Sequence, residues 1–134
     1  MTHKINYSKV LPEGLRIMNA LDDYSQNCGL EPSLLDLIKL RASQINACAY
    51  CVDMHSKDAR TGGETEQRLY NVSLWRETSY YTERERAALA FTEAVTLIAE
   101  ERVPDGVYEQ ARQQFSDEEL VKLMIAIVTI NAWN

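Results

Sequence analysis

The sequence has little basic charge and no long apolar run. Its 134 residues carry 14 Lys and Arg against 20 Asp and Glu, which gives a formal net charge of −6. Proteins that bind nucleic acids present a basic face to the phosphates, so we expect no nucleic-acid partner. The longest apolar stretch, residues 124–130, is too short to cross a bilayer, so we expect no membrane partner either.

Cysteine is also scarce, with three residues in the chain. No basic and then apolar leader follows Met1, which predicts a cytoplasmic protein whose cysteines are thiols and whose disulfides are transient. A chain of this length buries about two-thirds of its unfolded surface. We therefore expect residues 1–134 to form one domain that folds without a structural disulfide or metal.

Apolar residues recur at the spacing of helices, and no stretch alternates as a strand does. Pro12 and Pro32 suit the first turns of helices, and Gly29 suits a helix end. Thr82 and Ser116 each begin a capping box. After an extended segment at 1–10, the expected helices span residues 12–28, 32–46, 47–61, 65–71, 83–102, 104–115 and 117–134. The prediction is an all-α bundle of about six main helices.

The chemistry gathers in the stretch Cys48-Ala49-Tyr50-Cys51-Val52-Asp53-Met54-His55. It holds two of the three cysteines and one of the two histidines. On a helix that begins after an N-cap at Asn46, Cys48, Cys51 and His55 fall within about 60° of arc. Two thiols and an imidazole on one face form either a redox dithiol with its base or part of a metal site.

The residue types favour the dithiol. Unpaired N–H groups at a helix start lower the pKa of a nearby thiol, and His55 is close enough to take the proton of Cys51. Helical residues three apart have Cα atoms about 5 Å from each other, within the range of a disulfide. Adjacency to His55 favours Cys51 as the attacking sulfur, whereas exposure at the helix start favours Cys48. We choose Cys51.

Two other interpretations of the pair remain open. A structural zinc site would use Cys48, Cys51 and His55, with Cys28 or Asp36 as the fourth ligand. Three ligands on one straight helical face do not easily surround a tetrahedral ion, so we expect neither a metal nor another cofactor. The second interpretation is an inert, packed pair of cysteines.

A longer pattern surrounds the two cysteines. Asp36 lies twelve residues before Cys48, residues 40–51 read Leu-Arg-Ala-Ser-Gln-Ile-Asn-Ala-Cys-Ala-Tyr-Cys, and His55 follows. This signature resembles that of the alkylhydroperoxidase D-like proteins of the carboxymuconolactone decarboxylase superfamily. The resemblance extends to residues 74–77, 82–89 and 127–134.

The resemblance implies an all-helical fold, trimers or hexamers, and reduction of a hydroperoxide through the CxxC pair. Carried onto this sequence, it makes Cys51 the attacking sulfur, Cys48 the resolving one, and His55 the base, linked to an acid. The reductant would be a dithiol, such as a lipoyl or thioredoxin-like donor. The family's acid is usually glutamate, and Asp36 is one methylene shorter. Direct contact with His55 is therefore less expected than a bridging water or a different acid.

The CxxC pair also helps to distinguish a redox function from a non-redox one. The decarboxylase branch of the superfamily does not depend on such a pair, so Cys48 and Cys51 favour a redox enzyme. The alternative is a non-redox protein, either a decarboxylase-type enzyme or a helical binding assembly.

The last helix predicts self-association. It is apolar over more than one face, so we expect it to be central or to lie at a subunit interface. A second copy of the chain is the natural cover, and a homotrimer or homohexamer is preferred. The apolar residues are Leu120, Leu123, Met124, Ile125, Ile127, Val128 and Ile130.

Overall fold

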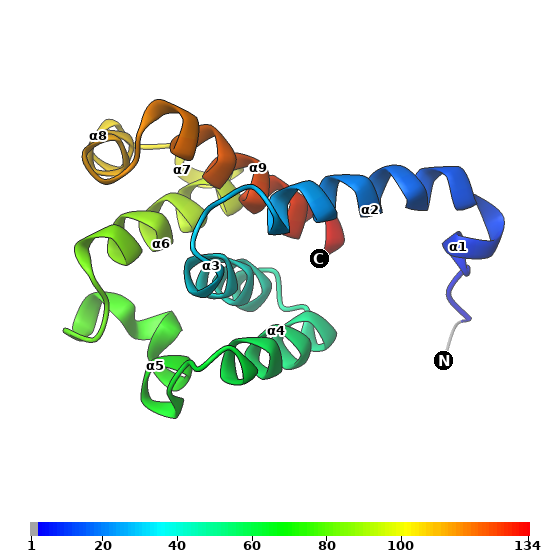
Figure 1. Cartoon of the computed structure of the whole chain (residues 1–134), viewed down its shortest axis with the longest axis horizontal. Coiled ribbons are helices and arrows are strands. Elements are labelled where there is room, and N and C mark those ends of the chain that lie inside the picture. The colour runs from blue at the N-terminus through cyan, green and yellow to red at the C-terminus, as the bar shows by residue number, and fades with distance from the viewer. Residues whose placement is uncertain (1–2) are drawn as a thin grey trace.

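The computed structural model describes residues 3–134, and within that range its regular structure is entirely helical (Figure 1). This confirms the all-α prediction. The elements are α1 (Tyr7–Val10), α2 (Pro12–Gln26), α3 (Pro32–Ile45), α4 (Ala49–Thr61), α5 (Glu66–Asn71), a 3₁₀ helix (Val72–Glu77), α6 (Glu83–Thr96), α7 (Ile98–Glu101), α8 (Asp105–Gln114) and α9 (Asp117–Trp133). No helix among the described residues is long and apolar enough to span a membrane.

Helix ends follow the local signals in most places. Thr82 and Ser116 each form a complete capping box, as the sequence predicts. The prediction of one helix over residues 83–102 is wrong, because Leu97 has non-helical backbone angles (φ −98°, ψ 33°) and separates α6 from α7. The extended segment expected at 1–10 is also wrong in part. The side chain of Asn6 accepts a hydrogen bond from the backbone of Lys9 and begins the single turn of α1.

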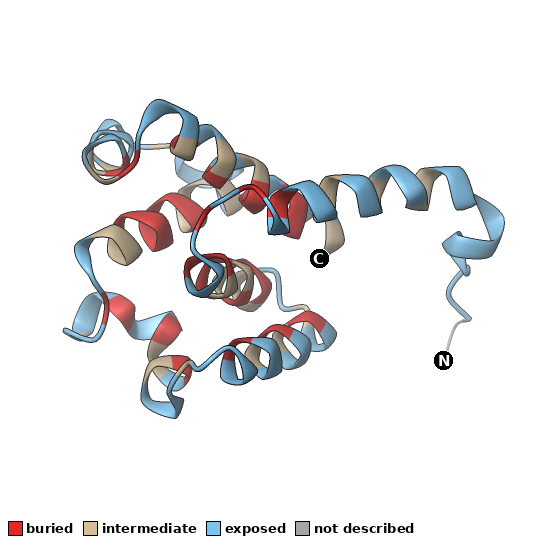
Figure 2. Cartoon of the chain, in the orientation of Figure 1, coloured by how far each residue is buried: buried red, intermediate tan, exposed pale blue. Residues whose placement is uncertain are grey.

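Helix α3 is the centre of the molecule. Figure 1 shows it surrounded by α4, α6 and α9, and Figure 2 shows buried residues around its circumference. The sequence left α9 as either central or an interface helix, and the structure gives the central place to α3. Its buried residues are Leu34, Leu35, Leu37, Ile38, Leu40, Ala42 and Ser43.

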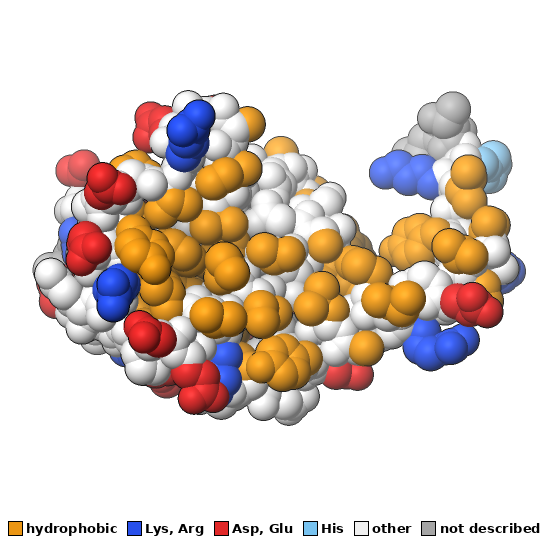
Figure 3. Space-filling model, turned by 90° about the horizontal axis from the view of Figure 1, so that it is seen from above, with side chains coloured by type: hydrophobic (Ala, Val, Ile, Leu, Met, Phe, Trp, Pro, Cys, Tyr) orange, Lys and Arg blue, Asp and Glu red, His pale blue; other side chains and the backbone are white. Residues whose placement is uncertain are grey.

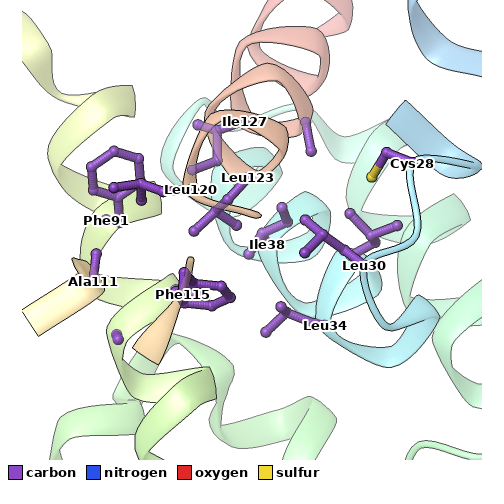
Figure 4. Packing of buried hydrophobic residues seen from close by; sticks show 14 residues of the cluster. Cys28, Leu30, Leu34, Ile38, Phe91, Ala111, Phe115, Leu120, Leu123 and Ile127 are labelled. Atoms are coloured by element: carbon purple, nitrogen blue, oxygen red, sulfur yellow. The ribbon is translucent and has the colours of Figure 1, made fainter. Parts of the chain in front are cut away.

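The main core lies between α3, α6, α8 and α9. Figure 4 shows Ile38 of α3 and Leu123 of α9 pointing toward each other, with Phe91 of α6 and Phe115 beside them. A second cluster of buried residues joins the other side of α3 to Leu69 and the 3₁₀ helix. Together the two clusters fix α3, and α3 in turn carries the turn that leads into α4.

One side of α9 stays uncovered in the single chain. Val121, Met124 and Val128 are about half exposed, although each directly follows a buried residue (Leu120, Leu123 and Ile127). Figure 3 shows this face as a band of hydrophobic side chains that runs from the main body toward the N-terminal arm. We define this surface as the α9 face.

Candidate active site

The turn between α3 and α4 sets the position of the two cysteines. Ala47 has a positive φ of 53°, and the backbone N–H of Cys48 donates to the carbonyl of Ser43 at 3.0 Å. The chain therefore reverses direction, and α4 begins only at Ala49. Cys48 is its N-cap, and its sulfur accepts a hydrogen bond from the backbone N–H of Cys51.

The predicted N-cap role of Asn46 is thus wrong. Asn46 instead ends α3, and its side-chain amide donates to the side chains of Asn131 (2.9 Å) and Asn134 (3.0 Å) in the C-terminal segment. Sequence reasoning selected the usual capping residue type, but tertiary contacts with α9 take that side chain. A sulfur fills the capping position.

The sulfurs of Cys48 and Cys51 are bonded to each other, and their Cα atoms are 5.3 Å apart. Cys51 is buried in the first turn of α4, whereas Cys48 is partly exposed at the helix start. Both sulfurs lie where backbone N–H groups lack helical partners, an environment that stabilises a thiolate once the bond opens. Cys28 lies in the main core and does not line this site.

His55 follows Cys51 by one helical turn and has only 8% of its surface exposed. Its Nε2 atom is buried without a hydrogen-bond partner among the described residues. Burial lowers the pKa of His55, and the positive charge of Lys39 lowers it further, against the opposing effect of Asp58 and Asp22. The imidazole is therefore neutral near pH 7 and can accept a proton.

One cavity of about 340 Å³ brings the three predicted residues together. Cys48, Cys51 and His55 all line it. The remaining lining residues come from α1, α2, α4 and α9: Tyr7, Asp22, Tyr50, Met54 and Trp133. Sequence reasoning missed Asp22 because no local spacing relates it to the cysteines.

Asp36 does not line this cavity. Its carboxylate lies beside Gly62, which ends α4, and it borders a separate cavity with Gln26 and Lys39. Helices α3 and α4 run antiparallel, so Asp36 is level with the far end of α4, about 10 Å along the axis from His55. Burial raises the pKa of Asp36. The catalytic role of Asp36 stays a prediction.

Between residues 3 and 134, no three His, Cys, Asp or Glu side chains are grouped so that they could hold a metal ion. The zinc interpretation needed Cys28 or Asp36 as a fourth ligand, and both lie outside the cavity.

Residues 12–94, from the start of α2 to near the end of α6, match the model of the carboxymuconolactone decarboxylase family. The chain belongs to that family. The matched region contains α3, α4 and both cysteines of the site, so the predicted resemblance is confirmed at the level of family and fold.

Relatives agree with this membership over almost the full length. The uncharacterised protein YdfG of Bacillus subtilis is 42% identical over all 134 residues, which cover 91% of its own length. A crystal structure from Agrobacterium tumefaciens is 51% identical, with a TM-score of 0.94 over 98% of this chain and 90% of that one. Its protein is described as of unknown function and is suggested there to be the antioxidant defence protein AhpD.

A more distant structure shares the fold. An uncharacterised peroxidase-related protein from a Silicibacter species has a TM-score of 0.78 at 20% identity, over 90% of this chain and 64% of that one. At this identity the likeness concerns the fold alone.

Proposed function

We propose that this family member is a thiol-dependent peroxidase that reduces hydroperoxides through Cys48 and Cys51, with His55 as the base. The observation that carries the proposal is the shared cavity: both sulfurs and the neutral imidazole line it, at the start of α4. A thiol attacks as its thiolate, and a neutral imidazole one turn away can take the thiol proton.

The reaction balances with these groups and one dithiol. Cys51 gives its proton to His55, and its thiolate attacks the terminal oxygen of a hydroperoxide, ROOH. The O–O bond breaks, Cys51 becomes a sulfenic acid, and the alkoxide takes the proton from His55 to leave as ROH. The thiol of Cys48 attacks the sulfenic sulfur, forms the disulfide and releases water. A dithiol reductant then returns two electrons and two protons to the pair.

The cavity walls favour an organic hydroperoxide over hydrogen peroxide. A second cavity of about 360 Å³ adjoins the first, and the two share Tyr7 and Trp133. Its other lining residues are largely apolar: Leu11, Gly14, Leu15, Met18 and Ala132. An apolar R group gains free energy by leaving water for such walls. The proposed reductant is a lipoyl or thioredoxin-like dithiol of the cytoplasm.

We also propose that the chain forms a homotrimer or homohexamer through the α9 face. Soluble monomers rarely expose a continuous apolar band, and closed symmetric assemblies are the usual way to cover one. Light scattering at micromolar concentration should return a multiple of the 15.3 kDa chain mass. A monomer mass would refute the assembly without touching the chemistry.

The function is tested by following hydroperoxide consumption with several dithiol donors, including a lipoyl one. Peptide mapping by mass spectrometry should show that hydroperoxide removes the free thiols of Cys48 and Cys51 and leaves Cys28 reduced. Cys28→Ala is the matched control, since this cysteine lies outside the cavity. A bridge to Cys28, or no consumption with any donor, would overturn the proposal.

A further inference from the structure

Helix α2 contributes a carboxylate to the cavity that holds the two cysteines. Asp22 of α2 lines it together with Cys48, Cys51 and His55, and it is the acidic residue of that lining. The side-chain amide of Gln26 donates to Oδ2 of Asp22 at 2.6 Å. Because Gln26 is one turn further along α2, this bond fixes the direction of the carboxylate.

Charged groups face His55 from three helices. Lys39 of α3 disfavours a proton on the imidazole, whereas Asp58 of α4 and Asp22 of α2 favour one. Asp58 is exposed on the outside of α4 and does not line the cavity. Tyr7 of α1 and Trp133 of α9 complete the surroundings, and neither carries a carboxyl group. Asp22 is therefore the acid that shares a solvent-accessible space with the imidazole.

Asp36 is poorly placed for the same task. It borders the other cavity, beside Gly62, and the charges that act on it are those of Lys39, Asp58 and Glu64 rather than of His55. Gln26 lines the cavity that Asp36 borders, and its side chain also donates to Asp22, so Gln26 lies between the two acids. The acidic group twelve residues before the CxxC pair is thus separated from the base that it was expected to serve.

We infer that Asp22 is the positioning residue that stabilises protonated His55 during thiol deprotonation. The inference rests on the proposed function, because it assigns a partner to the proposed base. When His55 takes the proton of Cys51, an imidazolium forms in a buried place, and the carboxylate of Asp22 offsets its charge across the cavity. The proton then leaves His55 for the alkoxide.

The test compares four single substitutions in the reduced protein without any peroxide: Asp22→Asn, Asp22→Glu, Asp23→Asn and Asp36→Asn. Asp22→Asn should lower the pKa of His55 in an NMR titration, for which exposed His3 supplies an internal reference. It should also slow alkylation of the dithiol near neutral pH by about 10-fold, since positioned proton transfer contributes at least that much. Asp22→Glu should restore most of both effects. Asp23→Asn is the matched control: it removes the same charge from the next, exposed residue of α2.

Two results would overturn the inference. One is a His55 pKa in Asp22→Asn equal to that in Asp23→Asn. The other is a larger shift in Asp36→Asn than in Asp22→Asn, which would return the role to Asp36. Because none of these measurements uses a hydroperoxide, they separate the two proposals. If His55 responds to Asp22 but the wild-type protein consumes no hydroperoxide, the peroxidase falls and the pairing of acid and base stands.

Discussion

Two polar groups of this molecule, Glu93 and His55, differ in how far their hydrogen-bonding capacity is used. Glu93 of α6 accepts hydrogen bonds from Arg41 (2.8 Å), from the indole of Trp75 (2.9 Å) and from Arg76. His55 of α4 is buried, whereas Glu93 is partly buried, and the Nε2 atom of His55 has no such partner in the described structure. Burial alone would raise the pKa of Glu93, and its three donors outweigh burial and lower it.

The difference separates a polar group that is held by its partners from one whose hydrogen-bonding capacity is unused. A partly buried charge that accepts from three donors holds one arrangement, and Glu93 ties α6 to α3 and to the 3₁₀ helix in this way. A buried group that lacks a partner beside a cavity keeps its hydrogen-bonding capacity for something that enters. Substitution of Glu93 should therefore act mainly on stability, and substitution of His55 mainly on reactivity.

Glu93→Ala should cause the largest change in stability. It leaves the buried Trp75 indole without its acceptor and removes the ion pair with Arg41, and breaking a pair that is largely shielded from water costs about 3 kcal/mol of unfolding free energy. Chemical denaturation measures the loss, and Glu100→Ala, at an exposed acid of α7, is the control. Peroxide reduction by the folded fraction should persist. A loss below about 1 kcal/mol would show that the hydrogen bonds and ion pairs of Glu93 contribute little to stability.

His55→Ala should slow hydroperoxide consumption by about 10²-fold, which corresponds to roughly 2.7 kcal/mol in the barrier. The helical circular dichroism spectrum should stay unchanged. Asp36→Ala should cost less, because its carboxylate lies outside the cavity. His3→Ala, at an exposed histidine, is the control. Negligible effects from both His55→Ala and Asp36→Ala would remove the proton relay.

Protonation of His55 and of Glu93 should lower the stability of the protein in two different pH ranges. Both pKa values are lowered on folding, so the unfolded chain binds more protons and stability falls as pH falls. For His55 the loss begins below its unfolded value of 6.5, and for Glu93 it begins below 4.5. Unfolding free energies measured against pH should therefore fall in two steps. The upper step should vanish in His55→Ala, and a profile that keeps it would contradict the burial of a neutral imidazole.

Asp36→Asn should have the smallest effect, and the opposite sign. Folding raises the pKa of Asp36, so its contribution to stability is complete below 3.8 and is lost as pH rises through the folded pKa. At neutral pH the substitution should therefore stabilise the protein, by less than about 1 kcal/mol because water reaches part of the carboxylate. Thermal unfolding of both proteins near neutral and acid pH checks the sign.

The sequence predicted best what local spacing controls. Cys48, Cys51 and His55 lie in eight consecutive residues, so helical geometry alone groups them. Asp22 is distant in sequence, and only the packing of α2 against the body brings it to the same cavity. The N-cap of α4 failed for a similar reason, because Asn46 finds partners in the C-terminal segment that no local pattern shows.

The central helix illustrates the same limit. The residues of α9 are the more apolar, yet α3 is the buried helix, because chain connections and packing decide which helix is enclosed. Burial of Ser43 there is compatible with its sequence since its hydroxyl donates to the carbonyl of Lys39 at 2.7 Å. A polar side chain that hydrogen-bonds to the backbone of its own helix can be buried, so a hydrophobicity pattern does not predict that such a helix is central.

The N-cap sulfur of α4 links the redox state of the protein to its backbone. Cys48 occupies the place where serine, threonine or aspartate usually starts a helix, and its sulfur accepts from the N–H of Cys51. When the pair opens, the sulfur of Cys48 is released from Cys51, and any thiolate character that it gains makes it a stronger acceptor for that N–H than a disulfide sulfur. The reduced protein would then hold the first turn of α4 more tightly than the oxidised one. Amide hydrogen exchange at the start of α4 would thus be slower when Cys48 and Cys51 are reduced than when they are disulfide-bonded.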